Sequence, residues 1–387
     1  MKSKLSEICD FVKEKTDVVG LDNTTYISTE NMLPNKGGII HASTLPTTKQ
    51  TQAFKKGDVL VSNIRPYFKK IWYAKFDGGC SNDVLVFRAK DGIDSMFLYY
   101  VLADDNFFRY AMTTSKGTKM PRGDKKAILE YDVPDILYEN QKKIANILSL
   151  TDKKIQFNIQ INENLLQQAQ ALYHSWFVNY EPFDGTKPAD WMYGTIDDLG
   201  TEIICGKTPS TKKSEYYGGN TPFITIPDMH NCVYNVSTER YLSALGVASQ
   251  LKKTLPHNTV CVSCIGTAGL VTLVSEDSQS NQQINSIIPK EEISAYYIYL
   301  LMRTLSETIN KLGQSGSTIV NLNKTQFGKI QVMIPSKRAL HDFDSLCSPL
   351  FDTILLNQKE NIKLSELRDT LLPKLMSGEL DVSSLDL

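Results

Sequence analysis

The sequence lacks any hydrophobic run long enough to cross a membrane. Its longest nearly continuous apolar stretch is residues 295–302, whereas a spanning helix needs about 20 such residues. Residues 1–7 carry charge without an apolar core, so we expect no secretory signal and a cytoplasmic protein. The seven cysteines are odd in number and irregularly spaced, which suits a reducing compartment. Because 42 basic residues face 43 acidic ones, any nucleic-acid site must be a local patch.

Catalytic signatures are missing as well. Residues 117–125 approach a phosphate-binding loop but have Asp124 where its lysine should stand. Cys261 and Cys264 form the sole CxxC pair, yet a zinc site needs a second pair, and in a strand these two side chains face opposite ways. The five histidines form no close pair, and no dinucleotide fingerprint, methyltransferase motif or nucleophile elbow occurs. We therefore expect no catalytic residue, no metal and no cofactor in this chain.

What the sequence does contain is a long internal repeat. Tyr26–Met32 recurs as Phe223–Met229, and Phe97–Leu102 recurs as Tyr297–Met302. Because the copies lie about 200 residues apart, the repeated unit is a whole domain rather than a short solenoid element. Short apolar runs broken by Gly, Pro, Asn and Ser predict a mixed α/β (α+β) globule in each half.

A glycine-free pattern follows each globule, over residues 141–177 and 340–377, and predicts two long helices. Positions spaced alternately by three and four residues indicate a coiled coil, so the two helices can pair within one chain. The alternative is that each helix packs only on its own globule. The predicted seam consists of Leu148, Ile155, Asn158, Asn162, Leu165 and Leu172 in the first helix and Ile354, Asn357, Asn361, Leu364 and Leu371 in the second.

The repeated asparagines and the length of the helices both bear on function. Asparagine at a seam position fixes register at a cost in stability, and opposed amides can hydrogen-bond. A pair of roughly 36-residue helices would measure about 54 Å, which suits two half-sites separated by one DNA turn of ~34–36 Å. We therefore expect a binding module in four segments: residues 1–140, 141–185, 186–339 and 340–387.

Local clusters favour nucleic acid as the ligand. Basic residues outnumber acidic ones over residues 49–77, where aromatics are interleaved, and again over residues 116–126. The second globule has a turn-rich basic loop at residues 206–213 and an amide run at residues 281–283, whose side chains can pair with adenine. Solvated charged faces and turn-forming amides are the alternatives.

The predicted DNA-binding residues follow from these clusters. In the first globule they are Arg65, Tyr67, Lys69, Lys70, Lys116, Thr118, Lys119, Arg122 and Lys125. In the second they are Gly206, Lys207, Thr208, Ser210, Lys212, Ile265, Gly266, Thr267, Asn281, Gln282, Gln283, Ser315, Gly316, Ser317, Asn323 and Lys324.

Taken in order, these segments resemble the specificity (S) subunits of type I restriction–modification systems over essentially the full chain. The most specific pieces are Gly206–Ser210 followed by Glu215–Gly219, together with Ser62–Pro66, Asn281–Asn285 and Leu371–Leu380. One departure is that Lys13–Asp17 lacks the Gly and Pro that the second globule has at the corresponding place. The corresponding loop of the first globule is therefore expected to have a different shape.

The resemblance implies two target recognition domains, each reading one half of a bipartite duplex DNA target. It also implies an antiparallel pair of helices that acts as a spacer and docks two modification (methyltransferase) subunits. S-adenosylmethionine, ATP and Mg would serve those subunits and the restriction subunits, leaving this chain non-catalytic. Two competing hypotheses are a protein-interaction scaffold with duplicated binding domains and a stand-alone methyltransferase.

Overall fold

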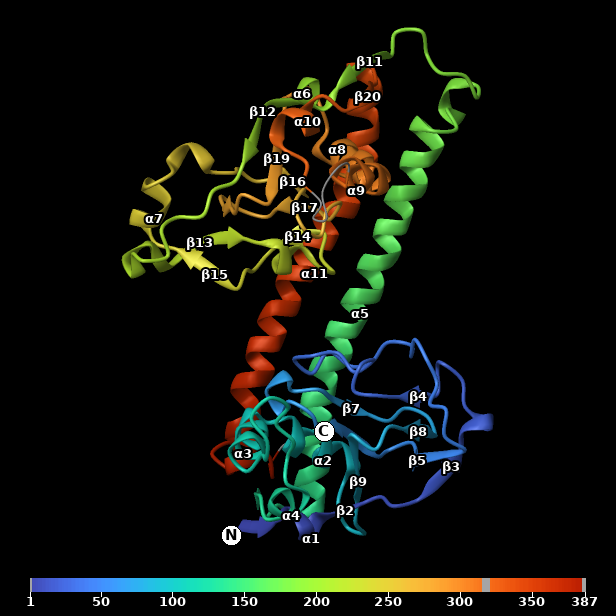
Figure 1. Ribbon diagram of the computed structural model, residues 1–387, viewed down its shortest axis with the longest axis vertical. Coiled ribbons are helices and arrows are strands. Elements are labelled where there is room, and N and C mark those ends of the chain that lie inside the picture. The colour runs from blue at the N-terminus through green and yellow to red at the C-terminus, as the bar shows by residue number, and fades with distance from the viewer. Residues whose placement is uncertain (1, 315–320, 385–387) are drawn as a thin grey trace. The chain divides into compact units, whose positions relative to one another are not determined.

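Residues 2–314 and 321–384 are described in this computed structural model, which divides into two compact units (Figure 1). Unit 1 comprises Met1–Ile155 and Lys363–Leu387, and unit 2 comprises Gln156–Ile362. Both boundaries between the units fall inside long helices, α5 (Tyr138–Phe177) and α11 (Lys337–Ser377). Each of these helices therefore contributes one segment to unit 1 and one to unit 2. The predicted mixed α/β architecture with two globular parts and two long helices is confirmed. The four predicted segment boundaries stay a prediction.

Unit 1 contains two four-stranded sheets, ordered β2-β9-β6-β7 and β3-β5-β8-β4, and a two-stranded pair, β1-β10. Strand β6 is buried along its whole length. Since successive side chains of a strand point to opposite faces, Val59 and Val61 enter one apolar cluster and Leu60 enters another. The strands are β1 (Lys2–Lys4), β2 (Cys9–Phe11), β3 (Lys15–Asp17), β4 (Tyr26–Ile27), β5 (Gln50–Phe54), β6 (Val59–Ser62), β7 (Ile71–Tyr73), β8 (Gly78–Cys80), β9 (Val84–Ala89) and β10 (Asp132–Pro134).

Unit 2 contains a five-stranded sheet, β12-β19-β16-β17-β14, a three-stranded sheet, β15-β13-β18, and a two-stranded pair, β11-β20. The order β12-β19-β16-β17 repeats β2-β9-β6-β7, and β11-β20 repeats β1-β10, whereas the remaining strands are arranged differently in the two units. Central strand β16 divides its side chains as β6 does, with Val260 and Val262 in one cluster and Cys261 in another. The repeat seen in the sequence therefore corresponds to a repeat of strand pairing in the sheet around β6 or β16 and in the two-stranded pair. The strands are β11 (Met192–Thr195), β12 (Gly200–Cys205), β13 (Tyr217–Ile224), β14 (Tyr234–Asn235), β15 (Arg240–Leu242), β16 (Val260–Ser263), β17 (Val271–Val274), β18 (Gln279–Ser280), β19 (Ile284–Pro289) and β20 (Gln331–Ile334).

Short helices complete each unit, and side-chain caps start several of them. The Asp104 carboxylate accepts a hydrogen bond from the Asn106 N–H at the start of α3, and the Ser294 hydroxyl accepts one from Tyr297 at the start of α8. None of the helices in the described part of the chain is long and apolar enough to cross a membrane. The helices are α1 (Leu5–Ile8), α2 (Ser95–Ala103), α3 (Asp105–Thr113), α4 (Lys125–Leu129), α6 (Ile196–Leu199), α7 (Ala244–Ala248), α8 (Ala295–Thr304), α9 (Ser306–Gly313) and α10 (Lys324–Gly328).

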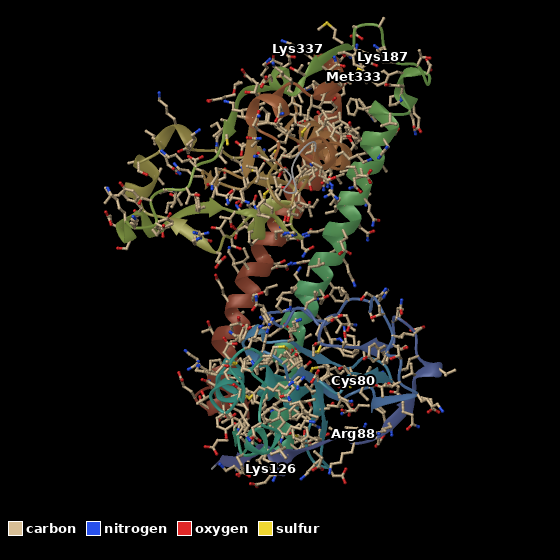
Figure 2. All side chains as sticks on the ribbon, in the orientation of Figure 1. Cys80, Arg88, Lys126, Lys187, Met333 and Lys337 are labelled. Atoms are coloured by element: carbon tan, nitrogen blue, oxygen red, sulfur yellow. The ribbon has the colours of Figure 1, made fainter. Side chains whose placement is uncertain are left out.

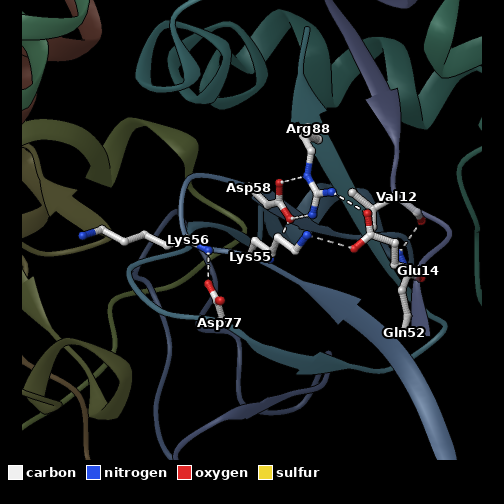
Figure 3. A network of polar contacts seen from close by, with 8 residues as sticks. All are labelled: Val12, Glu14, Gln52, Lys55, Lys56, Asp58, Asp77 and Arg88. Atoms are coloured by element: carbon white, nitrogen blue, oxygen red, sulfur yellow. Dashed lines mark hydrogen bonds and ion pairs between the residues drawn. The ribbon is translucent and has the colours of Figure 1, made fainter. Parts of the chain in front are cut away.

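A charged network joins β9 to the segments that precede β3 and β6 in unit 1 (Figure 3). Arg88 on β9, labelled in Figure 2, donates two parallel hydrogen bonds of 2.8 Å to the carboxylate of Asp58. Its third nitrogen reaches Glu14 at 2.8 Å, and Lys55 lies 3.4 Å from the same carboxylate. Asp58 is 2% exposed. Lys55, a member of the basic cluster at residues 49–77, therefore forms an ion pair within the fold.

In unit 2 the segments of α5 and α11 pair through the seam asparagines. The Asn158 amide donates to Asn361 at 2.9 Å, and the Asn357 amide donates to Asn162 at 2.8 Å. Because the earlier residue of one helix opposes the later residue of the other, these segments run antiparallel. The predicted seam residues are all buried or half-buried, and Leu165, Leu172 and Ile354 lie in one apolar cluster of unit 2.

In unit 1 the segments of the same helices pair through a charge. Asp152 on α5 accepts a hydrogen bond from Arg368 on α11 at 2.8 Å and another from Tyr100 at 2.7 Å. At the repeat-equivalent place in unit 2, Phe351 instead packs edge-on against Tyr299, with 5.5 Å between ring centroids. Position 152 of α5 therefore carries a charge, whereas its repeat-equivalent position 351 of α11 carries an aromatic ring.

Candidate DNA interface

Three loops that are distant in sequence meet at the end of β6 in unit 1. The Asn63 N–H donates to the Asp83 carbonyl at 2.8 Å, and the Gly123 N–H donates to the Asn63 carbonyl at 3.2 Å. The Arg65 N–H donates to the Pro121 carbonyl at 2.8 Å. We call residues 63–70, 81–83 and 114–124 the unit 1 junction. It brings the two predicted basic segments of the first globule together.

The corresponding loops of unit 2 meet at the end of β16. The Cys264 N–H donates to the Gln283 carbonyl at 2.8 Å, and the Leu322 N–H donates to the Cys264 carbonyl at 3.0 Å. Ile265 and Asn321 form an antiparallel bridge, as Ile64 and Arg122 do in unit 1. We call residues 264–267, 281–283 and 321–324 the unit 2 junction.

The turn-rich loop that follows β12 joins the unit 2 junction. The Lys207 N–H donates to the Ser280 carbonyl at 2.9 Å, and the Thr208 hydroxyl donates to the Gln282 amide oxygen at 2.7 Å. Lys207 is exposed and Thr208 is half-buried. The predicted Gly-Lys-Thr segment and the predicted amide run are thus adjacent.

The amides of residues 281–283 differ in exposure and in hydrogen bonding. Asn281 is 9% exposed and bonds Gln283 twice, through its amide nitrogen at 3.0 Å and its oxygen at 3.1 Å. Gln282 is exposed and Gln283 is half-buried. Asn281 therefore shapes the loop, while Gln282 and Gln283 present side chains at its surface.

Two of the predicted lysines of unit 1 already have partners within the fold. Lys69 and Lys36 both pair with Asp105, at 2.7 and 3.0 Å. Burial by itself would raise the pKa of Asp105, but hydrogen bonds from the two lysines outweigh it and lower that pKa. Lys70 donates to the Thr29 carbonyl at 2.7 Å, and burial lowers its pKa. These residues hold the loop in place.

The loop at residues 114–124 carries charges that are exposed. Lys116 pairs with Asp124 at 2.5 Å, and Arg122 pairs with Asp83 at 3.1 Å. The Lys116 hydrogen bond is the main cause of the lowered pKa of Asp124. The cations of both pairs are exposed while their carboxylates are half-buried, and ion pairs with such an exposed partner contribute little to stability.

The remaining predicted residues divide by exposure. Lys119 and Lys125 make no ion pair with any other described residue, and Asn323 caps α10 by accepting a hydrogen bond from Gln326. Ser315, Gly316 and Ser317 lie outside the described residues. Arg65 and Ile265 are half-buried and Gly206 is buried. The exposed members are Tyr67, Thr118, Lys119, Lys125, Ser210, Lys212, Gly266, Thr267 and Lys324.

Neither cysteine of the CxxC pair is placed for shared chemistry. Cys261 lies in one apolar cluster and Cys264 in another, and burial raises the pKa of each thiol to about 12. Within the described ranges, no group of three His, Cys, Asp or Glu side chains is arranged to hold a metal ion.

Sequence reasoning missed one residue of the junctions, Asp83, and the pairing of another, Asn321. Asp83 pairs with Arg122, and Asn321 bridges Ile265. The repeat carried a signal for Asp83, because Cys80–Asp83 and Gln279–Gln283 are corresponding segments. Asn321 lies within the predicted contact segment Ser315–Lys324, but its pairing with Ile265, more than fifty residues away, had no signal in the sequence.

Comparison with known proteins identifies the family. The family model described as "Type I restriction modification DNA specificity domain" matches residues 1–167 and 188–366. The chain belongs to the type I restriction–modification S subunit family. The HindI specificity subunit of Haemophilus influenzae is 32% identical, with 97% of this chain and 98% of that protein covered. The MjaIX specificity subunit of Methanocaldococcus jannaschii is 27% identical, with coverages of 76% and 71%.

A solved structure supports the fold. The type I restriction–modification S subunit from M. genitalium matches with a TM-score of 0.61 and 16% identity, covering 99% of this chain and 96% of that one. As an S subunit, the chain is a DNA specificity subunit and not a catalyst. The family carries no cofactor of its own, and S-adenosylmethionine and ATP belong to other subunits of such systems.

Proposed function

We propose that each junction contacts one half of a bipartite duplex DNA target in the cytoplasm, and that the helices set the number of unread bases between the halves. The observation that carries this proposal is that one backbone junction occurs in both units with different side chains on it. Two domains that bind different half-site DNA sequences require the same backbone framework and different side chains on it. The exposed lysines and Arg122 would contact phosphates, and the half-buried polar groups would contact bases.

Cys205 tests this proposal because it adjoins the unit 2 junction. Its thiol lies 3.6 Å from the Gln282 carbonyl and is half-buried. Burial raises the pKa of the other six thiols, those of Cys9, Cys80, Cys232, Cys261, Cys264 and Cys347, to about 12. Since the thiolate is the reactive form, we expect Cys205 to react fastest.

In the complex with its modification subunits, a maleimide should label Cys205 at least about tenfold faster than the other thiols. A duplex carrying the sequence methylated in the host should slow this labelling about tenfold or more, whereas a scrambled duplex should not. Mass spectrometry of the labelled peptide measures both rates, and Cys205→Ser removes the fast phase as a control. Equal labelling under saturating specific duplex would contradict a DNA contact at this junction.

We further propose that modification and restriction subunits assemble with this chain, and that modification subunits dock on the outward face of the helices. Phe157 on α5 and Leu356 on α11 occupy repeat-equivalent positions and are 59% and 67% exposed. Ile161, one turn after Phe157, is 45% exposed. Apolar side chains that recur on an outer helix face favour a protein partner.

A charged side chain at these positions should block assembly. Phe157→Glu with Leu356→Glu is expected to reduce co-purification of modification subunits at least about tenfold, because a carboxylate cannot be buried unpaired in the interface. The matched control is Gln156→Glu with Lys359→Glu, which adds carboxylates at exposed polar positions of the same helices. Undiminished co-purification of the first variant would place the docking surface elsewhere.

A further inference from the structure

The two junctions share a left-handed turn but fill it with different residues. Arg65 in unit 1 has φ 50° and Gly266 in unit 2 has φ 76°. Each directly follows the residue that bridges to the third loop, Ile64 or Ile265. Glycine adopts this conformation without strain, whereas arginine does not. Unit 1 has an arginine at a turn where unit 2 has the less strained glycine. This difference indicates that the Arg65 side chain has a function of its own.

The Arg65 side chain has hydrogen-bond donors that are not used within the fold. Its Nε is buried and has no hydrogen-bond partner within the described residues. It forms no ion pair there either, whereas neighbouring Lys69 is held by Asp105. An arginine with uncommitted donors offers the two-pronged geometry that matches the O6 and N7 acceptors of guanine.

Unit 2 places carboxamides where unit 1 places charges. Gln283 stands at the position of Asp83, and Asn321 stands at that of Arg122. The Gln283 amide nitrogen lies 3.6 Å from the point that a Cβ on Gly266 would occupy. That nitrogen donates to no other described residue, and its oxygen accepts only from Asn281. A carboxamide with one free donor and a remaining acceptor site matches the N7 and N6 of adenine.

We propose that unit 1 reads a guanine of its half-site through Arg65, and that unit 2 reads an adenine of the other half-site through Gln283. This inference rests on the proposed function and adds the class of base that each junction recognises. Arg65 acts by direct contact, and the hydrogen bond from its N–H to the Pro121 carbonyl at 2.8 Å holds the turn beside the third loop.

The experiment uses the S subunit assembled with its modification subunits. Arg65→Gly keeps the left-handed turn and removes the side chain, Arg65→Lys keeps the charge without the fork, and Gln283→Ala removes the carboxamide. Arg109→Ala, at an exposed site on α3 that is not part of the junction, is the charge-matched control. Methylated motifs are mapped in host DNA, and purified complexes are titrated with duplexes altered at one base pair at a time.

Arg65→Gly should reduce discrimination about 10- to 100-fold at one guanine in one half-site, with the other half-site unchanged. Arg65→Lys should retain affinity and lose most of that discrimination, because a single ammonium cannot make the bidentate contact. Gln283→Ala should relax one adenine position in the opposite half-site. The control should keep the wild-type motif.

The outcomes separate this inference from the function on which it rests. If the wild-type complex shows no sequence-selective binding or methylation, the proposed function fails. If the wild type is selective but Arg65→Gly keeps the same motif and discrimination, or relaxes a base other than guanine, the inference about base class is overturned. The duplex titration reports discrimination even for a variant that binds too weakly to methylate.

Discussion

Replacing Arg88 by leucine is expected to lower the free energy of unfolding of unit 1 by about 3–5 kcal/mol, because it leaves a buried carboxylate without its cation. Asp58 is 2% exposed and receives both parallel hydrogen bonds of Arg88. After the substitution, the Lys55 N–H, at 2.7 Å, would be the one hydrogen-bond donor left to that carboxylate among the residues that the structure describes. Urea denaturation, with hydrogen exchange in β6 and β9 to localise the effect, measures the loss.

Glu14→Gln is the matched control for this network. The Arg88 hydrogen bond is the main cause of the lowered pKa of Glu14, but this carboxylate is exposed, and exposed pairs contribute little. We therefore expect hardly any change in the urea midpoint. An Arg88→Leu variant as stable as Glu14→Gln would show that Asp58 does not depend on the guanidinium.

Replacing Gly206 by alanine is expected to abolish recognition by unit 2, with a loss of affinity for specific DNA of about 100-fold or more. A Cβ at this position would lie 2.1 Å from the Asn281 carbonyl oxygen and 2.4 Å from that of Ser280. Both are backbone atoms that cannot rotate away, so the loop must leave the amide run. Titration of the complex with its specific duplex measures the effect.

Gly20→Ala provides the control, because a Cβ there meets nothing within 4 Å and the backbone φ is not positive. This variant should bind as the wild type does. The Gly206→Ala chain should keep hydrogen-exchange protection in the strands of unit 1, which distinguishes a local rearrangement from general unfolding. Wild-type affinity of Gly206→Ala would remove this loop from the proposed interface.

The sequence alone determined the repeat and the two long helices, and it singled out the asparagines that pair between those helices. These are patterns of spacing, and spacing is decided by the periods of helices and strands. Asn158 and Asn357 occupy the same place in two copies of one helix, so both were visible without coordinates. The family resemblance depended on the same short ordered segments, and the comparisons confirmed it.

Only the tertiary structure decided which charges have partners and which side chains meet. Lys69 and Lys119 look alike in a basic cluster, yet Lys69 is held by Asp105 from a helix 36 residues away, whereas Lys119 has no ion-pair partner among the described residues. Likewise, Arg65 and Gly266 occupy equivalent turns only because β6 and β16 end at the same kind of loop junction. Such contacts arise when the sheets bring distant loops together, so no local pattern encodes them.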